Sequence, residues 1–309
     1  MFSFLSGPRL GLEITSQALR LGVLARKNGA LSLGASKVVP LPAGLVAENY
    51  QSLNIKDPAA FTALLTQALR DVPVKTRRIG LSLPDSIFRV QMLEFDDLPE
   101  KTADRDRVVR WRLEKGAAFD ISNTVLRYQA VKRPEKGVSV LACVAKKDVL
   151  SQYEDLITSA GYEVWELGLS SLNALNFFQP ALRAKRVFGF ALVWITETSY
   201  ATIVVEQGGP RFYRYKEIKP GAPTDIKDRL MREIDDALHF YMHLDRHQPS
   251  ELGHLFLAGD AGVLTLLADG LKGSMSFDIE VLDPRSSAAI GMQQGMDALA
   301  AALGAGGAL

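Results

Sequence analysis

One pattern occurs twice in this 309-residue chain, first from Leu10 and again from Ala191. Each copy consists of an apolar strand, a tight turn and a β-hairpin, and the copies extend to Val39 and to Ile218. The hairpins close at Asn28-Gly29 and at Gly208-Gly209, which are dipeptides typical of tight turns between strands. Two such units, each opening one half of the chain, predict a duplicated nucleotide-binding α/β fold.

The residues after the first hairpin predict the remainder of one α/β unit. Asp57 is positioned to cap a helix whose first residue is Pro58, and a strand from Arg78 to Leu83 follows. Three antiparallel strands, a helix and a fourth strand form the first half of a ribonuclease-H-like unit. We therefore predict an α/β chain with a duplicated ribonuclease-H-like (actin-like) fold, two lobes, and an α+β insert in the first lobe.

The insert is predicted to span residues 85–160. Its expected elements are strands at 87–94, 126–131 and 138–144 and helices at 99–118 and 149–160, the last capped by Asp148. The first actin-like subdomain would consist of residues 1–84 together with 161–185. A basic linker at residues 183–186 would join it to the second lobe. Residues 186–309 would form the second lobe, with 221–253 as its smaller helical part.

The second half is predicted to repeat the plan of the first. Its hairpin is followed by a long helix at 224–244, a strand at 254–257, a helix at 262–271, a strand at 277–282 and a terminal helix at 286–303. The last residues, from Gly304 to Leu309, are expected to fray.

Composition limits the classes of partner. The formal net charge is only +1, so no overall field attracts the chain to nucleic acid or to an anionic membrane. The single cysteine, Cys143, lies in an apolar run, which favours a buried thiol and a reducing compartment. The longest apolar run, Val187 to Ile195, is far shorter than the ~20 residues of a spanning helix. We expect a cytoplasmic protein with no direct membrane insertion.

The tight turn after the first strand of each copy is where actin-like ATPases carry an acidic residue and a glycine. The carboxylate holds magnesium or its waters, and the glycine lets backbone N–H groups approach phosphate. Here Glu13 keeps the acid of the first turn, but Thr15 replaces the glycine. In the second turn Trp194 replaces the acid and Thr196 replaces the glycine. The pattern therefore predicts a scaffold without catalytic residues.

A degenerate nucleotide site would still have recognisable members. The candidates are Glu13, Thr15, Ser16, Arg20, Thr196, Gly259 and Gly262. The last two belong to a loop that can open a helix, whose N–H groups favour an anion, although a loop of this composition is also an ordinary turn. We expect no cofactor, with ATP and magnesium as the alternative, and no metal site at His239 and His243.

Several short segments resemble one family in their order and spacing. They are Leu10 to Ile14, Val39 to Pro42, Leu83 to Phe88, Trp111 to Glu114, Ala118-Phe119, Ala160 to Tyr162, Asn173 to Asn176, Phe212 to Arg214, Pro220-Gly221 and Ala289 to Gly291. In these segments the chain resembles the PilM family of type IV pilus assembly proteins, which are actin-like relatives of the division protein FtsA. The resemblance implies four subdomains, with residues 85–160 as the insert that distinguishes FtsA-like proteins.

The resemblance also implies a role and partners. Members of that family lie at the inner face of the cytoplasmic membrane and capture the N-terminal tail of a PilN-like inner-membrane protein, which they connect to pilus motor components. Self-association is a further expectation. For the groove that holds the tail, the chain offers Leu83, Pro84, Phe88, Trp111 and Phe119, each of which is otherwise explained as a core residue.

Two other functions remain open at this point. Most of the family bind ATP through intact turns, so an ATP-binding conformational switch in the same complex is the first. The second is the cytoplasmic scaffold of a related type II secretion system. A sugar kinase of the same fold is disfavoured, because Trp194 leaves no base beside the second turn.

Overall fold

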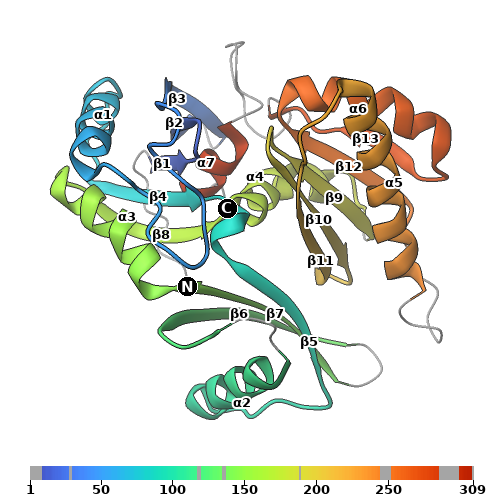
Figure 1. The fold of residues 1–309 in the computed structure, drawn as a ribbon. Coiled ribbons are helices and arrows are strands. Elements are labelled where there is room, and N and C mark those ends of the chain that lie inside the picture. The colour runs from blue at the N-terminus through green and yellow to red at the C-terminus, as the bar shows by residue number, and fades with distance from the viewer. Residues whose placement is uncertain are drawn as a thin grey trace.

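The computed structural model describes residues 9–27, 30–116, 120–133, 137–187, 189–243, 252–284 and 299–307. These residues form two lobes, each built on a five-stranded sheet, and a smaller three-stranded sheet that lies below them in Figure 1. Within the described residues no helix combines the length and the apolar character that crossing a bilayer requires.

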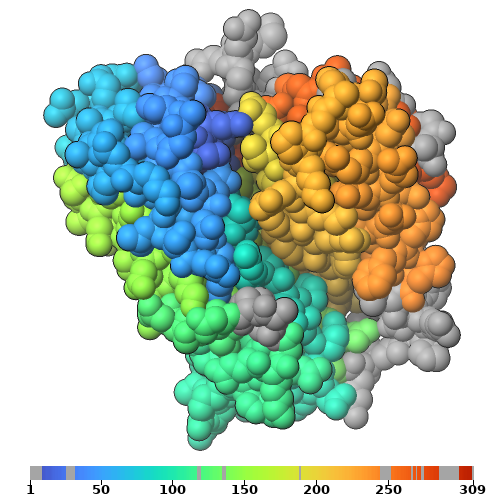
Figure 2. Space-filling model, in the orientation of Figure 1, coloured from blue at the N-terminus to red at the C-terminus, as the bar shows by residue number. Residues whose placement is uncertain are grey.

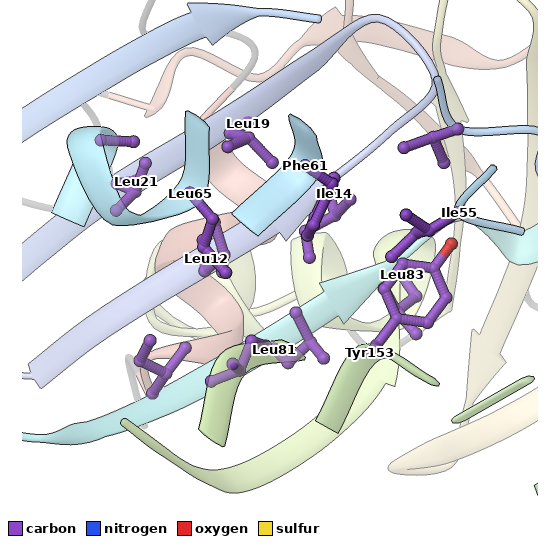
Figure 3. Close-up of a cluster of buried hydrophobic side chains, with 14 of the residues drawn as sticks. Leu12, Ile14, Leu19, Leu21, Ile55, Phe61, Leu65, Leu81, Leu83 and Tyr153 are labelled. Carbon is purple, nitrogen blue, oxygen red and sulfur yellow. The ribbon is translucent and has the colours of Figure 1, made fainter. Parts of the chain in front are cut away.

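The first-lobe sheet has the order β3-β2-β1-β4-β8, with β1 antiparallel to β2 and parallel to β4. Its strands are β1 (Arg9–Ile14), β2 (Ala18–Lys27), β3 (Ala30–Pro40), β4 (Arg78–Leu83) and β8 (Glu163–Leu169). Helices α1 (Pro58–Arg70) and α3 (Lys147–Ser159) bury Phe61, Leu65 and Tyr153 among the apolar side chains of these strands (Figure 3). The Asp57 carboxylate accepts the Ala60 N–H at 3.0 Å, which confirms the predicted cap.

The second-lobe sheet repeats this order as β11-β10-β9-β12-β13, which confirms the predicted duplication. Its elements are β9 (Phe190–Ile195), β10 (Ser199–Glu206), β11 (Gly209–Glu217), α5 (Pro223–Met242), β12 (His254–Gly259), α6 (Ala261–Ser274) and β13 (Asp278–Val281). The turn between β10 and β11 lies one residue earlier than predicted. Gln207 and Gly208 carry its positive φ angles of 52° and 78°, while Gly209 already belongs to β11. The predicted Asn28-Gly29 turn lies outside the described residues.

The insert forms its own sheet, in the order β5-β7-β6, after a short 3₁₀ turn, η1 (Asp85–Ile87). Its elements are β5 (Arg89–Phe95), α2 (Thr102–Gly116), β6 (Thr124–Lys132) and β7 (Val138–Lys146). Buried Val109 and Leu113 of α2 pack with Leu93 and Val140 on one face of this sheet. Cys143 on β7 is half-buried, and burial raises the pKa of its thiol to about 12.

Helix α3 differs from its prediction in two respects. It was expected to belong to the insert, but its buried Val149, Tyr153 and Ile157 pack in the first-lobe core, so the part of the insert with a separate sheet is residues 89–146. The helix also begins before Asp148, which accepts a hydrogen bond from Asn123 Nδ2 at 3.1 Å and does not cap it.

Helix α4 (Ser170–Ala184) lies between the lobes. It continues through Pro180, so the first residues of the predicted basic linker form its last turn. Phe177 and Phe178 before the proline and Leu182 after it are buried in one cluster with side chains of β9 and β12. This apolar burial offsets the backbone hydrogen bond that a proline removes from a helix.

The C-terminal helix α7 (Ala300–Ala305) crosses back to the first lobe, where it contacts β1, β4 and α4. A Cβ on Gly11 would lie 1.7 Å from the carbonyl oxygen of Ala302, and one on Gly80 would lie 1.7 Å from that of Ala305. Only glycine allows the helix to approach the sheet this closely. The prediction that the chain frays from Gly304 is therefore wrong up to residue 307, because these residues are held in this contact.

Candidate functional site

A cleft between the two lobes brings the two tight turns together (Figure 2). Its lining contains Trp194 and all but one of the residues predicted for a degenerate ATP site: Glu13, Thr15, Ser16, Arg20, Thr196 and Gly259. The free volume is about 40 Å³, whereas pockets for small ligands enclose about 300–1,000 Å³. We call this region the interlobe cleft.

The hydroxyl of Thr15 closes the first turn. Its Oγ1 accepts the N–H groups of Gln17 and Ala18 at 3.3 and 3.1 Å. The N–H of Ser16 donates to Glu48 Oε1 at 2.7 Å. The backbone donors of this turn, which would otherwise be available to a phosphate, are thus satisfied by the protein's own side chains.

The second turn is closed in the same way. Thr196 Oγ1 accepts the N–H groups of Thr198 and Ser199 at 3.4 and 3.0 Å. Neither threonine has a positive φ angle, so each turn is closed by a hydroxyl group and not by a residue in the left-handed region. The sequence indicated that the glycines were missing, but it did not indicate this replacement.

A buried chain of hydrogen bonds joins the lobes at the bottom of the interlobe cleft. Trp194 Nε1 on β9 donates to Ser170 Oγ at 3.0 Å, and that hydroxyl donates to Glu13 Oε1 at 2.6 Å. Arg20 lies 3.4 Å from the other oxygen of Glu13. Trp194, which replaces the acidic residue of the second turn, therefore bonds indirectly to the acidic residue of the first.

Burial dominates the electrostatics of Glu13, whose side chain is only 2% exposed. Removal from water raises the pKa of its carboxyl above the ordinary value of 4.5, and the Arg20 charge and the Ser170 hydrogen bond lower it only in part. Glu48 adds to the rise through charge repulsion. Burial therefore makes a negative charge on Glu13 energetically unfavourable.

Asp85 makes a second buried connection between the lobes. Its carboxylate accepts the Ser171 N–H at 3.1 Å and the hydroxyl of Tyr213, on β11, at 2.8 Å. Burial raises its pKa, and these hydrogen bonds oppose the rise. The first two residues of α4, Ser170 and Ser171, thus hold one carboxylate each.

The charged residues among those described as lining the interlobe cleft are mainly acidic. They include five carboxylates, Glu13, Glu48, Asp85, Glu197 and Asp260, and one cationic side chain, Arg20. A triphosphate would meet an excess of negative charge here, which is the reverse of the field in a phosphate-binding site.

The loop before α6 is also closed by its own side chain. Asp260 caps the helix, because its Oδ1 accepts the N–H groups of Gly262 and Val263 at 2.9 and 3.3 Å. Gly262 lies in the first turn of α6 and is not among the residues that line the cleft. Gly259 has a φ of 130°, and a Cβ there would lie 1.8 Å from the carbonyl oxygen of Ile195. Its role is to let β12 pass close to β9.

The four described residues among the five proposed for peptide binding do not line one common groove. Leu83 and Phe88 are buried in the first-lobe core, and buried Pro84 borders the interlobe cleft. Trp111 is 52% exposed and lines a hollow on the insert. Phe119 lies outside the described residues.

A larger groove lies where the first lobe, the start of the insert and the second lobe meet. We call it the junction groove; it has a volume of about 810 Å³ and is lined by residues 48–51, 85–86, 88–90 and 213–217, with Lys219, Arg229 and Glu233. Tyr50 connects two of these parts, since its hydroxyl donates to the carbonyl of Asp120 at 3.0 Å and the Arg89 guanidinium lies 4.5 Å from its ring centre. Of the predicted peptide-binding residues, Phe88 borders this groove.

Solved structures of other proteins share the fold of this chain. No protein-family profile matches the chain, and no curated protein matches its sequence. A chain of the structure described as the PilM-PilN type IV pilus biogenesis complex is similar over 96% of this chain and 97% of its own, with a TM-score of 0.76 and 20% identity.

Two further solved structures are similar at lower scores. A Bacteroides thetaiotaomicron protein with an actin-like ATPase fold and unknown function matches at a TM-score of 0.53 and 12% identity, over 97% of this chain and 98% of its own. The cytoplasmic domain of EpsL, an inner-membrane component of the type II secretion system of Vibrio cholerae, matches at 0.53 and 10% identity, over 89% of each chain. The predicted actin-like fold is therefore confirmed.

Proposed function

We propose that this protein is a non-catalytic adaptor of a type IV pilus assembly platform at the inner face of the cytoplasmic membrane. It would bind the N-terminal tail of a PilN-like membrane protein and couple it to pilus motor components. The observation that carries this proposal is the closed interlobe cleft, in which Trp194, Ser170 and Glu13 are hydrogen-bonded where an actin-like ATPase would hold nucleotide. The likeness to a chain of a PilM-PilN complex supports the choice of partner.

The junction groove is the proposed site for the tail. Its volume of about 810 Å³ falls in the range of ligand pockets, whereas the interlobe cleft has about 40 Å³. Tyr50, Phe88, Tyr213 and Tyr215 border it, and aromatic side chains contribute most of the affinity in many peptide interfaces.

The test is a titration of the purified protein with a synthetic tail of the PilN-like protein from the same organism. Gln51→Trp should weaken binding at least about tenfold, because Gln51 is exposed and borders the groove. Ser52→Trp is the matched control, because Ser52 is the next residue in the chain, is also exposed and does not border the groove. Equal affinity of both variants for the tail would contradict the proposed groove.

Mg-ATP separates this proposal from the conformational switch. We expect no heat of binding at about 1 mM nucleotide, which corresponds to a binding free energy weaker than about 4 kcal/mol. Micromolar binding would instead favour the switch. The same titration with the tail of a type II secretion partner decides between a pilus assembly platform and a type II secretion system, because the fold is similar to components of both.

A further inference from the structure

Among the described residues, one edge of β5 is free of strand pairing. β5 lies at one end of the insert sheet, and among the described residues its only strand partner is β7 (Figure 1). The backbone N–H and C=O groups on the other side of such a strand are available to pair with another extended chain. Natural proteins often protect exposed edges of this kind or use them for binding.

A groove runs along this edge, between β5 and α2. It consists of two hollows of about 400 and 450 Å³, which share Glu94 and Arg112 in their lining. Residues 91–94 of β5 line the first hollow and residues 94–96 line the second, so residues of the free edge border both hollows. We call the two hollows together the edge groove.

The two ends of the edge groove differ in chemistry. Among the described residues that line the first hollow, the charged ones are Arg112, Lys115 and Glu94, and the Glu94 carboxylate is already bound by Arg133 at 3.1 Å and by the Ser139 hydroxyl at 2.8 Å. This end is therefore positive. The Lys115 ammonium lies 4.1 Å from the centre of the Trp111 ring. At the second hollow Phe95, Val108 and Trp111 provide apolar surface beside Arg112, Arg133 and two carboxylates.

Two polar groups in the edge groove have no partner among the described residues. Gln91 Oε1 is buried without a hydrogen bond, which is energetically unfavourable. Arg112 forms no ion pair or hydrogen bond with the described residues, whereas Arg107 on the same helix pairs with Asp104. A bound segment would supply a donor to Gln91 and a carboxylate to Arg112.

We propose that the edge groove binds an extended segment of a partner protein by adding a strand to β5. The segment has a carboxylate in the first hollow, beside Arg112 and Gly116, and an apolar or aromatic side chain in the second hollow, beside Phe95 and Val108. Main-chain pairing with β5 gives the affinity, and the positive and apolar ends give the direction. This site is separate from the junction groove and does not depend on which protein occupies that groove.

The probes are two labelled octapeptides of alternating polar and Val residues, one with Glu in its N-terminal half and Phe in its C-terminal half, the other in reverse order. Fluorescence anisotropy should show that one order binds, and that replacing its Glu by Lys weakens it at least about tenfold. N-methylation of alternate amides should weaken it as much, because main-chain pairing is lost. Equal binding of the Glu and Lys peptides, or no binding of either order at millimolar concentration, would overturn the proposal.

Variants of α2 locate the binding. Arg112→Glu should weaken the peptide at least about tenfold, while Arg107→Glu, the same charge change at an exposed residue outside the groove, should change it less than about twofold. Gly116→Leu should block the first hollow; a Cβ there meets its nearest neighbour, Gln91 Nε2, at 3.6 Å, so the fold tolerates it. Equal losses in the Arg112 and Arg107 variants would contradict the site.

Hydrogen exchange gives an independent readout. Bound peptide should slow exchange of the amides of residues 91–96 and leave those of the junction groove unchanged. If these amides are instead protected without peptide, in proportion to protein concentration, then β5 pairs with a second copy of the chain and the assignment to a partner peptide is wrong. The Arg112→Glu variant should still bind a PilN-like tail with unchanged affinity. Loss of peptide binding at the edge groove would then be distinguishable from failure of the function proposed above.

Discussion

At the scale of single residues, Thr15 and Thr196 close the two tight turns with their hydroxyl groups. Each occupies the glycine position of its turn, and each accepts two backbone N–H groups of that turn through its hydroxyl. The substitution therefore removes the donors that a phosphate would use and leaves the backbone satisfied. The same hydrogen bonds therefore close both turns and keep their backbone groups satisfied.

Glu13 gives a prediction about pH. Its folded-state pKa is raised by burial, so above the ordinary value of 4.5 the folded protein binds a proton that the unfolded chain has released. The stabilising contribution is complete below that pH and is lost as pH rises through the folded-state pKa. Glu13→Gln should therefore show a smaller fall in unfolding free energy between about pH 4.5 and pH 7, measured by urea denaturation.

Asp71 provides a control of opposite sign. It is an exposed carboxyl whose pKa is lowered from 3.8 by its hydrogen bond to Lys37. Its contribution is present above that value and is lost as pH falls. Asp71→Asn should leave the slope above about pH 5 unchanged. Identical slopes for the wild type and Glu13→Gln would show that the raised pKa of Glu13 is wrong.

At the scale of elements, the contact between α7 and the first-lobe sheet leads to a second prediction. Gly80→Ala should lower the unfolding free energy by at least about 2 kcal/mol, because its Cβ would lie 1.7 Å from the Ala305 carbonyl oxygen and α7 must move. Gly34→Ala on β3 is the control, since its Cβ would meet its nearest atom at an ordinary 3.6 Å. Chemical denaturation of both variants tests this, and equal stability would mean that α7 is not closely packed.

The elements themselves were largely predictable, and their ends were not. Asp57 and Pro58 fixed the start of α1 because capping depends on adjacent residues. In contrast, α4 continues through Pro180 because aromatic side chains are buried between the lobes, a cause that no local pattern contains. The assignment of α3 to the insert was wrong for the same reason, since its buried face meets strands from other parts of the chain.

At the scale of the whole molecule, Trp194 is expected to hold the lobes together. Trp194→Ala removes a 96%-buried side chain (4% exposed) and its hydrogen bond to Ser170, so unfolding should require about 3–5 kcal/mol less. Small-angle scattering should show a more open molecule. Trp111→Ala is the matched control, because Trp111 is 52% exposed and its loss should cost less than about 0.5 kcal/mol. A similar effect of both substitutions would exclude a bridging role for Trp194.

The sequence alone determined the repeated strand order and the identity of the residues at the two turns, because both follow from patterns within a few neighbouring positions. Six of the seven candidates for a degenerate nucleotide site line one cleft, since equivalent turns of two repeated units face each other across it, whereas Gly262 does not line it. The fold was predictable at this level.

The contacts of these residues, in contrast, follow from the tertiary structure. The bond from Ser170 to Glu13 joins positions 157 residues apart, and Asp85 and Tyr213 are 128 residues apart. The approach of α7 to Gly11 and Gly80, and the open edge of β5 beside α2, likewise depend on how distant segments pack. Periodicity and capping act over a few residues, whereas closing a cleft or leaving an edge free depends on burial and hydrogen bonding between segments that meet only in the folded chain.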